Sequence, residues 1–248
     1  MTEAVEDIAV LYRDERCAVV NKPCGLMAHA SSLSRGEDDF LLHRLRDQFQ
    51  GKVHLIHRLD RATSGCVLLA FDAEMASLLG KVFMGRDVRK DYLAVCRGWP
   101  EQRFTVDHAL DGGPGKPEKK PAVTDFIRLA TAELAMPSAA HESSRYALMQ
   151  CSPVTGRFRQ ILRHLKHVSH HLIGDTSHGD GRHNRNFRML GVHRMLLHAW
   201  RLQFVHPLSG EKVAVEAPLD REFLKALAVL GMFEPVLDES TGGKSETN

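Results

Sequence analysis

Long apolar runs are missing from this 248-residue sequence. The longest uninterrupted one, residues 66–71, is far shorter than the roughly 20 residues that a membrane-spanning helix takes. The N-terminus, MTEAVEDIAV, carries acidic residues where a secretion signal carries Lys or Arg. The sequence therefore predicts neither a membrane span nor export.

Paired cysteine motifs are also missing. The five cysteines are odd in number and widely spaced, and no Cys-x-x-Cys motif occurs. Disulfide frameworks and zinc sites of that type are therefore not indicated. We interpret the cysteines as reduced thiols and expect a cytoplasmic protein.

A strong overall charge is lacking as well, since the formal net charge is +2 at pH 7. Residues 155–206, however, contain nine Lys or Arg and two Asp or Glu, so this stretch carries +7 and the remainder −5. A basic segment in an otherwise acidic chain suggests contact with a polyanion such as nucleic acid. A solvated basic helix would give the same count.

Hydrophobic periodicity and turn residues predict many short strands and a few helices. Strands are expected at 8–12, 17–21, 53–56, 66–71, 92–96, 123–129, 145–151, 202–205 and 212–216, and helices at 40–49, 72–84, after Thr155-Gly156 and at 219–230. Without βαβ regularity, this pattern favours an α+β fold with a mixed, largely antiparallel sheet flanked by helices. We expect one catalytic domain over 1–234, a mobile surface loop at 111–121 and a disordered tail at 235–248.

The loop at residues 57–65 carries most of the polar chemistry. It reads HRLDRATSG, so Asp60 follows a strand and stands between Arg58 and Arg61. Arginine neighbours favour the ionised carboxylate and fix its direction, which suits nucleophilic attack or charge stabilisation. An Arg–Asp pair that only fastens the loop would give the same local pattern.

The whole string, His-Arg-Leu-Asp-x-x-Thr-Ser-Gly, resembles the motif around the catalytic aspartate of the RluA/RsuA superfamily of pseudouridine synthases. The resemblance runs from about residue 8 to about residue 230. Its further landmarks fall at matching distances and are Asn21-Lys22-Pro23, Lys90-Asp91-Tyr92, Thr155-Gly156-Arg157 and Leu197-His198-Ala199.

The resemblance implies a role for each matched residue. Asp60 would attack the target nucleoside or stabilise its separated sugar while the uracil rotates and rejoins the ribose through C5. Tyr92 would stack on the flipped base, Arg58 would hold the substrate strand, and Leu197 would form an apolar floor under the uracil. Without the resemblance, Tyr92 and Leu197 would be interpreted as core residues. The isomerisation is redox-neutral, so we expect no metal and no organic cofactor.

One stretch departs from the family pattern. The family reads Thr-Gly-Arg-x-His-Gln-Ile-Arg-x-His, and its second arginine pairs with the catalytic aspartate. Here Leu162 takes that position and Arg159 replaces the first histidine. By helical phase, Arg159 and Arg163 lie opposite Leu162, so neither is an obvious substitute. Of the two, we name Arg163 as the candidate cation at the substrate site.

Residues 173–187, IGDTSHGDGRHNRNF, offer many donors and little bulk, as an RNA-binding loop requires. The string resembles the TruC-type branch of the superfamily, whose members act on tRNA at uridine 65 in the T stem. The resemblance thus implies tRNA as the partner, and we expect a monomer.

Three alternatives stay open. The same superfamily also modifies rRNA, and the same basic surface would suit a non-catalytic RNA-binding protein. A metal-dependent hydrolase could use His178, Asp180 and His183, although no established spacing such as His-Glu-x-x-His occurs and the arginines nearby would repel a cation.

Overall fold

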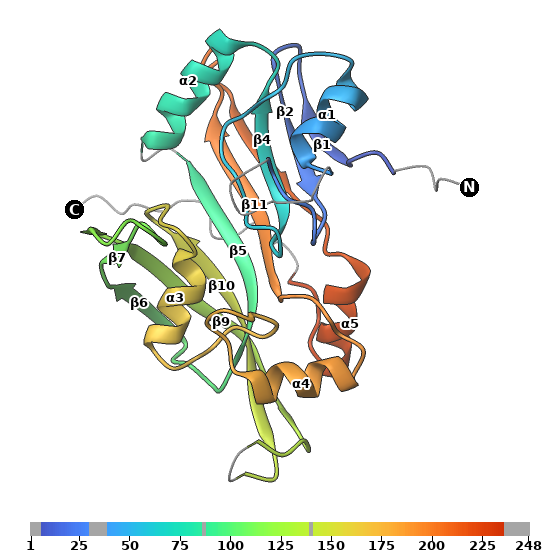
Figure 1. Cartoon of the computed structure of the whole chain (residues 1–248), viewed down its shortest axis with the longest axis vertical. Coiled ribbons are helices and arrows are strands. Elements are labelled where there is room, and N and C mark those ends of the chain that lie inside the picture. Colours follow the sequence, from blue (N-terminus) through green and yellow to red (C-terminus); the bar gives the residue numbers. More distant parts are fainter. Residues whose placement is uncertain (1–5, 30–38, 86–87, 139–140, 236–248) are drawn as a thin grey trace, which may run out of the picture.

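A computed structural model describes residues 6–29, 39–85, 88–138 and 141–235 (Figure 1). The helices are α1 (Leu41–Phe49), α2 (Ala73–Met84), α3 (Gln160–His167), α4 (Gly181–Met189) and α5 (Arg221–Val229). The strands are β1 (Val10–Arg13), β2 (Cys17–Lys22), β3 (His54–Leu55), β4 (Ser64–Ala70), β5 (Arg89–Arg97), β6 (Arg103–Asp107), β7 (Leu110–Asp111), β8 (Lys119–Lys120), β9 (Val123–Leu134), β10 (Ser144–Pro153), β11 (Leu197–Val205) and β12 (Lys212–Glu216).

One large sheet organises the described residues. Its strands follow the order β1-β2-β4-β11-β5-β10-β9-β6, with β3 added on β4 and β12 on β11. Neighbouring strands in this sheet are antiparallel except β4 and β11, which are parallel. The predicted α+β fold on a mixed, largely antiparallel sheet is therefore confirmed.

Helices α1 and α2 cover opposite faces of the β2–β4 half of the sheet. Leu45 of α1 shares an apolar cluster with Leu69 of β4, whereas Met75 of α2 shares one with Leu68. Successive residues of a strand point to opposite faces, so this alternation separates the two helices. The side chain of Asp72 accepts a hydrogen bond from Met75 N at 2.8 Å, which confirms the predicted start of α2.

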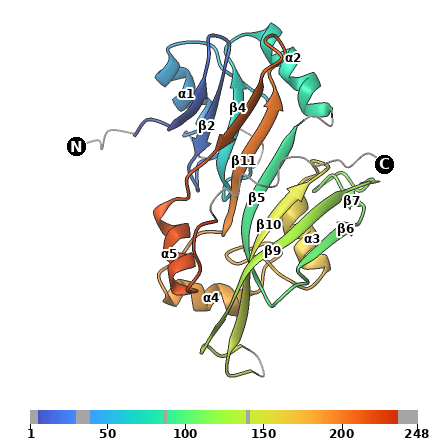
Figure 2. The same cartoon turned by 180° about the vertical axis from the view of Figure 1, so that it is seen from behind.

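Helices α3 and α5 flank the β5–β10 half of the sheet in the same way. Leu165 of α3 packs in one cluster with Ala94, and Phe223 of α5 packs in another with Leu93 and Val95. Seen from behind, β9 and β10 lie in front of α3 (Figure 2). The site described below lies where these two halves of the sheet meet.

The parallel pairing of β4 with β11 joins the two halves. Ser64 lies opposite His198 and Gly65 opposite Ala199. Gly65 has φ +111°, and a Cβ atom there would come within 2.2 Å of the Ala199 carbonyl oxygen. Only glycine permits this approach. The end of the 57–65 loop is thus held directly against β11.

Residues 173–187 are not the loop that the sequence predicted, because their second half forms α4. The side chain of Asp180 caps the helix by accepting a hydrogen bond from Arg182 N at 3.0 Å. Asn184 and Phe187 are buried, while Arg182 and Arg185 are exposed. The glycines and polar residues of this segment made its helical period hard to recognise in the sequence. The hydrogen-bond donors of the helix point outward on one face.

Three smaller differences concern element boundaries. Helix α3 begins at Gln160, several residues after Thr155-Gly156, and residues 111–121 contribute to a short β7–β8 hairpin. Strand β6 was not foreseen. Apart from residue 235, the predicted disordered tail lies outside the described residues. All five cysteines are free thiols, and no helix in the described ranges is long and apolar enough to cross a membrane.

Candidate active site

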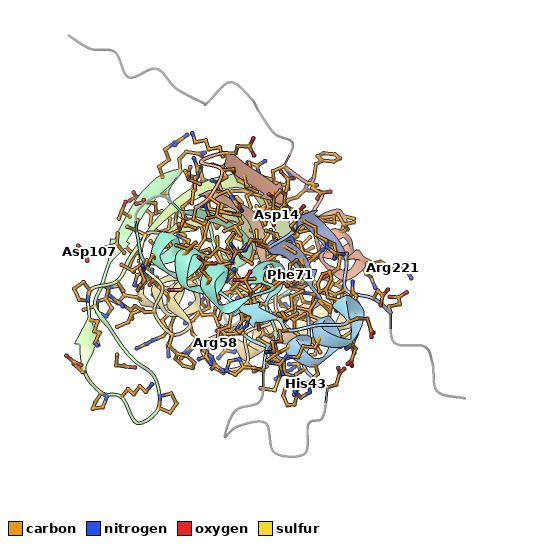
Figure 3. The ribbon with its side chains drawn as sticks, turned by 90° about the horizontal axis from the view of Figure 1, so that it is seen from above. Asp14, His43, Arg58, Phe71, Asp107 and Arg221 are labelled. Carbon is orange, nitrogen blue, oxygen red and sulfur yellow. The ribbon has the colours of Figure 1, made fainter. Side chains whose placement is uncertain are left out.

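A cavity of about 1050 Å³ opens beside the 57–65 loop. Four of the five residues that the sequence singled out line it together: Arg58, Asp60, Tyr92 and Leu197. The rest of the wall comes from the end of α2, the start of β5 and residues 152–162. Arg58 is exposed and lies along the same side of the molecule as His43 (Figure 3). The structure thus gathers residues from distant parts of the chain around one carboxylate.

The sheet register explains this gathering. Thr63 N donates to the Asp60 carbonyl oxygen at 3.0 Å, forming a tight turn immediately before β4. Strand β11 then pairs with β4 on one side and β5 on the other, with Tyr92 opposite Ala199. Leu197 lies two residues earlier on β11. Three adjacent strands therefore deliver the carboxylate, the phenol and the apolar side chain to one end of the sheet.

A buried lysine holds the backbone of the 57–65 loop in place. Lys22 is fully buried, and its Nζ donates to the carbonyl oxygens of Pro23 at 2.8 Å, Leu26 at 2.7 Å and Arg61 at 3.2 Å. Burial lowers the pKa of Lys22 to about 7. The bond to Arg61 fixes the backbone directly after Asp60. The Asn-Lys-Pro landmark in the sequence pointed to this lysine but not to its contact with the loop.

Burial and charge act in opposite directions on Asp60. Burial raises the pKa of its carboxyl, and the positive charges of Arg159, Arg58 and Lys22 oppose that rise. The carboxylate of Asp175 adds to the rise. Desolvation of a carboxylate is costly, so nearby cations are what keep it ionised. Asp60 is therefore a partly buried carboxylate in a cavity lined by more cations than acids.

Tyr92 and Leu197 form the less polar part of the wall. Leu197 is 3 % exposed and belongs to the same apolar cluster as Leu162, which also lines the cavity. Burial raises the pKa of the Tyr92 phenol, and the negative charge of Asp60 raises it further. The phenol thus keeps its proton at neutral pH. An aromatic ring beside two leucines is the surface on which a flat base can lie.

Arg163 is not where the sequence placed it. It does not line the cavity; its Nη2 binds Asp111 Oδ2 at 2.7 Å and its Nη1 the Asp111 carbonyl oxygen at 2.9 Å. Arg159, which the helical phase predicted to point away from the position of Leu162, does line the cavity. It precedes α3 with φ +49°, so the helical period does not apply to it. A left-handed residue at the helix start could not be foreseen from the sequence pattern.

A buried hydrogen-bond chain continues from the loop toward α5. His198 Nε2 donates to the Ala217 carbonyl oxygen at 3.0 Å, so Nδ1 is free to accept from Ser64 Oγ at 2.7 Å. Arg194 Nη2 donates to the same Ser64 oxygen at 2.8 Å and its Nη1 ion-pairs with Asp220. Since Ser64 is 2 % exposed, this chain supports the loop and offers no accessible nucleophile.

The proposed metal ligands of the alternative hydrolase have other partners. Asp180 binds Arg97 Nη1 at 2.7 Å, and His183 Nδ1 lies 3.0 Å from the hydroxyl of Tyr146. His178 is the third residue of that set, and the three do not form a cluster of ligand atoms in the described part of the chain.

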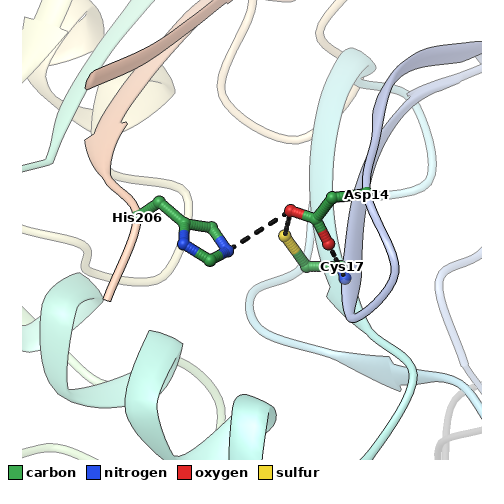
Figure 4. Close-up of side chains that lie close together, drawn as sticks. All are labelled: Asp14, Cys17 and His206. Atoms are coloured by element: carbon green, nitrogen blue, oxygen red, sulfur yellow. Dashed lines mark hydrogen bonds and ion pairs between the residues drawn. The ribbon is translucent and has the colours of Figure 1, made fainter. Parts of the chain in front are cut away.

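Asp14, Cys17 and His206 do bring ligand-type atoms together, away from the cavity (Figure 4). Cys17 Sγ donates to Asp14 Oδ2 at 3.1 Å, and His206 Nε2 lies 3.3 Å from the same oxygen. Ser209 N donates to His206 Nδ1 at 3.2 Å, so the proton of the neutral ring is on Nε2. A metal would need the lone pair of Nε2, and we therefore interpret this cluster as a junction between the β1–β2 turn and the β11–β12 hairpin.

Comparisons with known proteins identify the family of this chain. The sequence profile of the RNA pseudouridylate synthase family matches residues 16–167. A protein of Vibrio parahaemolyticus named tRNA pseudouridine synthase C is 39 % identical over 224 residues, which cover 86 % of this chain and 91 % of that protein. Its namesake in Vibrio cholerae is 37 % identical over 240 residues, covering 93 % of this chain and 98 % of that one.

Solved structures show the same fold. Human RNA Pseudouridylate Synthase Domain Containing 1 superposes with a TM-score of 0.69 at 29 % identity, covering 88 % of this chain and 86 % of that one. Human RNA Pseudouridylate Synthase Domain Containing 4 superposes with a TM-score of 0.70 at 23 % identity, covering 92 % and 95 %. With the profile, the relatives and the fold in agreement, this chain belongs to the RNA pseudouridylate synthase family.

Proposed function

We propose that the chain isomerises uridine to pseudouridine in tRNA, at uridine 65 of the T stem, with Asp60 as the catalytic carboxylate. One observation carries the proposal: Asp60 shares a cavity with Tyr92, Leu197 and Arg58, the residues that the family resemblance assigns to the base and its strand. An Arg–Asp pair that only fastens the loop would not need an aromatic and apolar wall around it.

The chemistry follows from these groups. Asp60 attacks the nucleoside or stabilises the separated sugar as the C–N glycosidic bond breaks. The uracil stays between Tyr92 and Leu197, rotates, and forms a C–C bond from C5 to C1′ of the sugar, which displaces the carboxylate of Asp60 if it has bonded there. C5 then loses its proton to water, and N1 gains one. A base within a stem has to leave its stack first, at a cost of a few kcal/mol, and the phenol ring of Tyr92 compensates part of this cost.

The choice of tRNA rests on the relatives and on charge. The two Vibrio proteins carry the name tRNA pseudouridine synthase C. The basic stretch 155–206 contributes Arg157 and Arg159 to the cavity wall and exposed arginines to α4. Phosphate contacts from such residues supply most of the affinity for nucleic acid. We further propose that the enzyme works as a monomer in the reducing cytoplasm, in keeping with its five free thiols.

The decisive experiment uses unmodified tRNA that carries tritium at C5 of its uridines. Joining C5 to the sugar must expel this label into water, so the assay reports the chemical step itself. We expect the wild-type protein to release tritium with and without EDTA. Asp60→Asn, which keeps the shape of the side chain but not its charge, should reduce the release at least about 1,000-fold while the tRNA is still bound.

Each result has a definite meaning. Tritium release by Asp60→Asn close to that of the wild type would exclude Asp60 as the catalytic group. A wild-type protein that binds tRNA tightly and releases no label would favour a non-catalytic RNA-binding protein. Release from rRNA transcripts but not from tRNA would favour the rRNA alternative, and loss of activity in EDTA would contradict a metal-free reaction. Sequencing of the product RNA identifies the uridine.

A further inference from the structure

The carboxylate of Asp60 needs a positive charge that the family pattern would take from position 162. In this chain Leu162 occupies that position, lines the cavity and is 4 % exposed within an apolar cluster. The neighbouring cation, Arg163, is bound to Asp111. Position 162 and its neighbour therefore contribute no charge to the cavity.

Arg159 reaches the cavity from outside the helix. It stands at the residue before α3, with φ +49° and ψ +39°. Arg159 thus lies in the turn between β10 and α3, and its side chain belongs to the same cavity wall as Asp60. Among the positive groups that act on the Asp60 carboxylate, Arg159 has the largest effect, ahead of Arg58 and Lys22.

Two contacts hold the guanidinium in place. Arg159 Nη1 donates to Ser177 Oγ at 2.8 Å, and the guanidinium carbon lies 5.1 Å from the centre of the Phe158 ring. Ser177 is itself fixed, because its backbone N donates to Asp175 Oδ1 at 2.8 Å. Asp175 is 4 % exposed, so the turn that carries Ser177 is anchored in the interior. An arginine that only bound RNA phosphates would not need a fixed guanidinium. The contacts with Ser177 and Phe158 therefore favour a role within the cavity.

We propose that Arg159 is the positioning residue of this active site: its guanidinium, held by Ser177, keeps the carboxylate of Asp60 ionised and oriented in place of a cation at position 162. The proposal rests on the proposed function of Asp60. It implies that the positive charge is supplied from a residue three positions earlier in the sequence than the family pattern has it. Asp60 and Arg159 form no direct salt bridge in the described structure, so the charge acts across the cavity.

The first test measures the ionisation of Asp60 directly and does not need turnover. Carbon-13 labelling of aspartate allows the Asp60 carboxyl to be titrated by NMR, with Asp60→Asn used for its assignment. The groups that act most strongly on this carboxyl are Arg159, Arg58, Lys22 and Asp175, and it acts in turn on Tyr92. The other titratable residues of the cavity wall are His57, Arg89, Lys90, Asp125 and Arg157. Removing one of the cations raises the pKa, because the ionised form loses its stabilisation. We expect Arg159→Gln to raise it by about one unit or more, and Arg159→Lys to raise it less.

The second test follows the same variants by tritium release from tRNA. Arg159→Gln should lower kcat at pH 7 by about tenfold or more and move the acidic limb of the pH profile to higher pH. Adding Leu162→Arg to Arg159→Gln should restore a large part of kcat, because position 162 lines the same cavity. Arg157→Gln is the matched control: Arg157 lies in the same wall, but its Nε binds the Pro121 carbonyl oxygen at 3.0 Å and it is not among the main charges that act on the Asp60 carboxyl. Its effect should be on KM, with the acidic limb in place.

An unchanged pKa of Asp60 in Arg159→Gln would overturn the proposal, whatever the activity. So would a loss confined to KM in Arg159→Gln, since that would make Arg159 a tRNA contact. Failure of the proposed function has a different signature: the wild-type protein would release no tritium, while the NMR titration would still decide whether Arg159 controls the carboxyl. Ser177→Ala, which keeps Arg159 but removes its hydrogen bond, should lie between the wild type and Arg159→Gln in both measurements.

Discussion

At Asp60, the reactivity of a single side chain depends on neighbours that lie far away in the sequence. The loop motif identifies the carboxylate and one of its cations, Arg58, but the other two cations come from β2 and from the residue before α3. Lys22 acts both through its charge and through its bonds to the backbone. Residue types at a fixed spacing predicted which group is central. Which cations surround it depends on tertiary contacts and on one left-handed residue, Arg159, and neither is visible in a hydrophobic period.

A first prediction at this scale concerns Lys22. Lys22→Met keeps most of the apolar volume but removes the donors from three carbonyl oxygens, of which that of Arg61 belongs to the active-site loop. We expect the free energy of unfolding to fall by about 2–4 kcal/mol, since buried acceptors would lose their partner. Urea unfolding at pH 7 measures the change.

Lys119→Met is the control for this change, because Lys119 is exposed on β8. It should alter stability by no more than about 0.5 kcal/mol. Equal effects of the two substitutions would show that the three carbonyl contacts of Lys22 contribute nothing specific. A kcat of Lys22→Met that falls further than its folded fraction would show that the loop, too, depends on this lysine.

At the scale of elements, the sequence predicted the strands well and the segment 173–187 poorly. The β11–β12 hairpin and helix α2 have strong turn and cap signals, and both are present as predicted. Helix α4 begins with a glycine and contains two asparagines and a histidine, all residues of lower helix propensity, so its period is hidden. Its helical form comes from the Asp180 cap and from the burial of Phe187 in the core. Tertiary packing outweighed local propensity here.

Because residues 181–189 form a helix, their arginines lie together on one surface. Arg182, Arg185 and Arg188 recur every three residues and are exposed on one side of α4. We predict that replacing all three by Gln weakens tRNA binding and reduces the slope of log affinity against log salt by about 2. The value of kcat at saturating tRNA should stay the same, because none of the three lines the cavity. Filter binding at several salt concentrations gives the slope.

The same number of charges can be removed elsewhere as a control. Lys52, Arg103 and Lys212 are exposed on other elements and do not line the cavity. Their replacement by Gln should leave the salt slope within about 0.5 of the wild type. Equal slopes for both triple variants would mean that tRNA responds to overall charge and does not lie along α4.

At the scale of the whole molecule, the fold class could be predicted and the strand order could not. Many short strands without βαβ regularity indicated α+β, and the family resemblance indicated which α+β fold. The parallel contact of β4 with β11, however, joins segments without any local signal, and it depends on Gly65. The split of charge was visible in the sequence. Its distribution over the cavity wall and α4 appeared only with the three-dimensional arrangement.

Two histidines, the partly buried His57 and the fully buried His198, make the stability of the whole molecule sensitive to acid. Burial lowers the pKa of His57 to about 3 and that of His198 to about 4, so both stay neutral in the folded protein. In the unfolded chain they take up protons near pH 6.5. The unfolded state therefore binds more protons between about pH 6.5 and 4, and the free energy of unfolding should fall as the pH is lowered through this range. Stability from this source is fully present above pH 6.5.

Urea unfolding between pH 7.5 and 4.5 checks the sign. In His198→Gln the slope should be shallower by up to about 1.4 kcal/mol per pH unit, because one proton uptake is removed. The difference between wild type and variant isolates this histidine from the carboxylates, which titrate in both proteins. Parallel curves would show that His198 is protonated to the same extent in the folded and unfolded chains.

The contact between β4 and β11 joins two strands that are synthesised at very different times. Ser64 and His198 are hydrogen-bonded across 134 positions of sequence. During synthesis, the Asp60 loop leaves the ribosome long before the strand that must lie beside it, and closing so long a loop is a late and slow step. If Asp60 is the catalytic group that we propose, the nascent protein carries this carboxylate before the wall of the cavity has formed. We therefore expect catalytic competence to arrive with β11, so that a chain ending before β11 does not modify RNA.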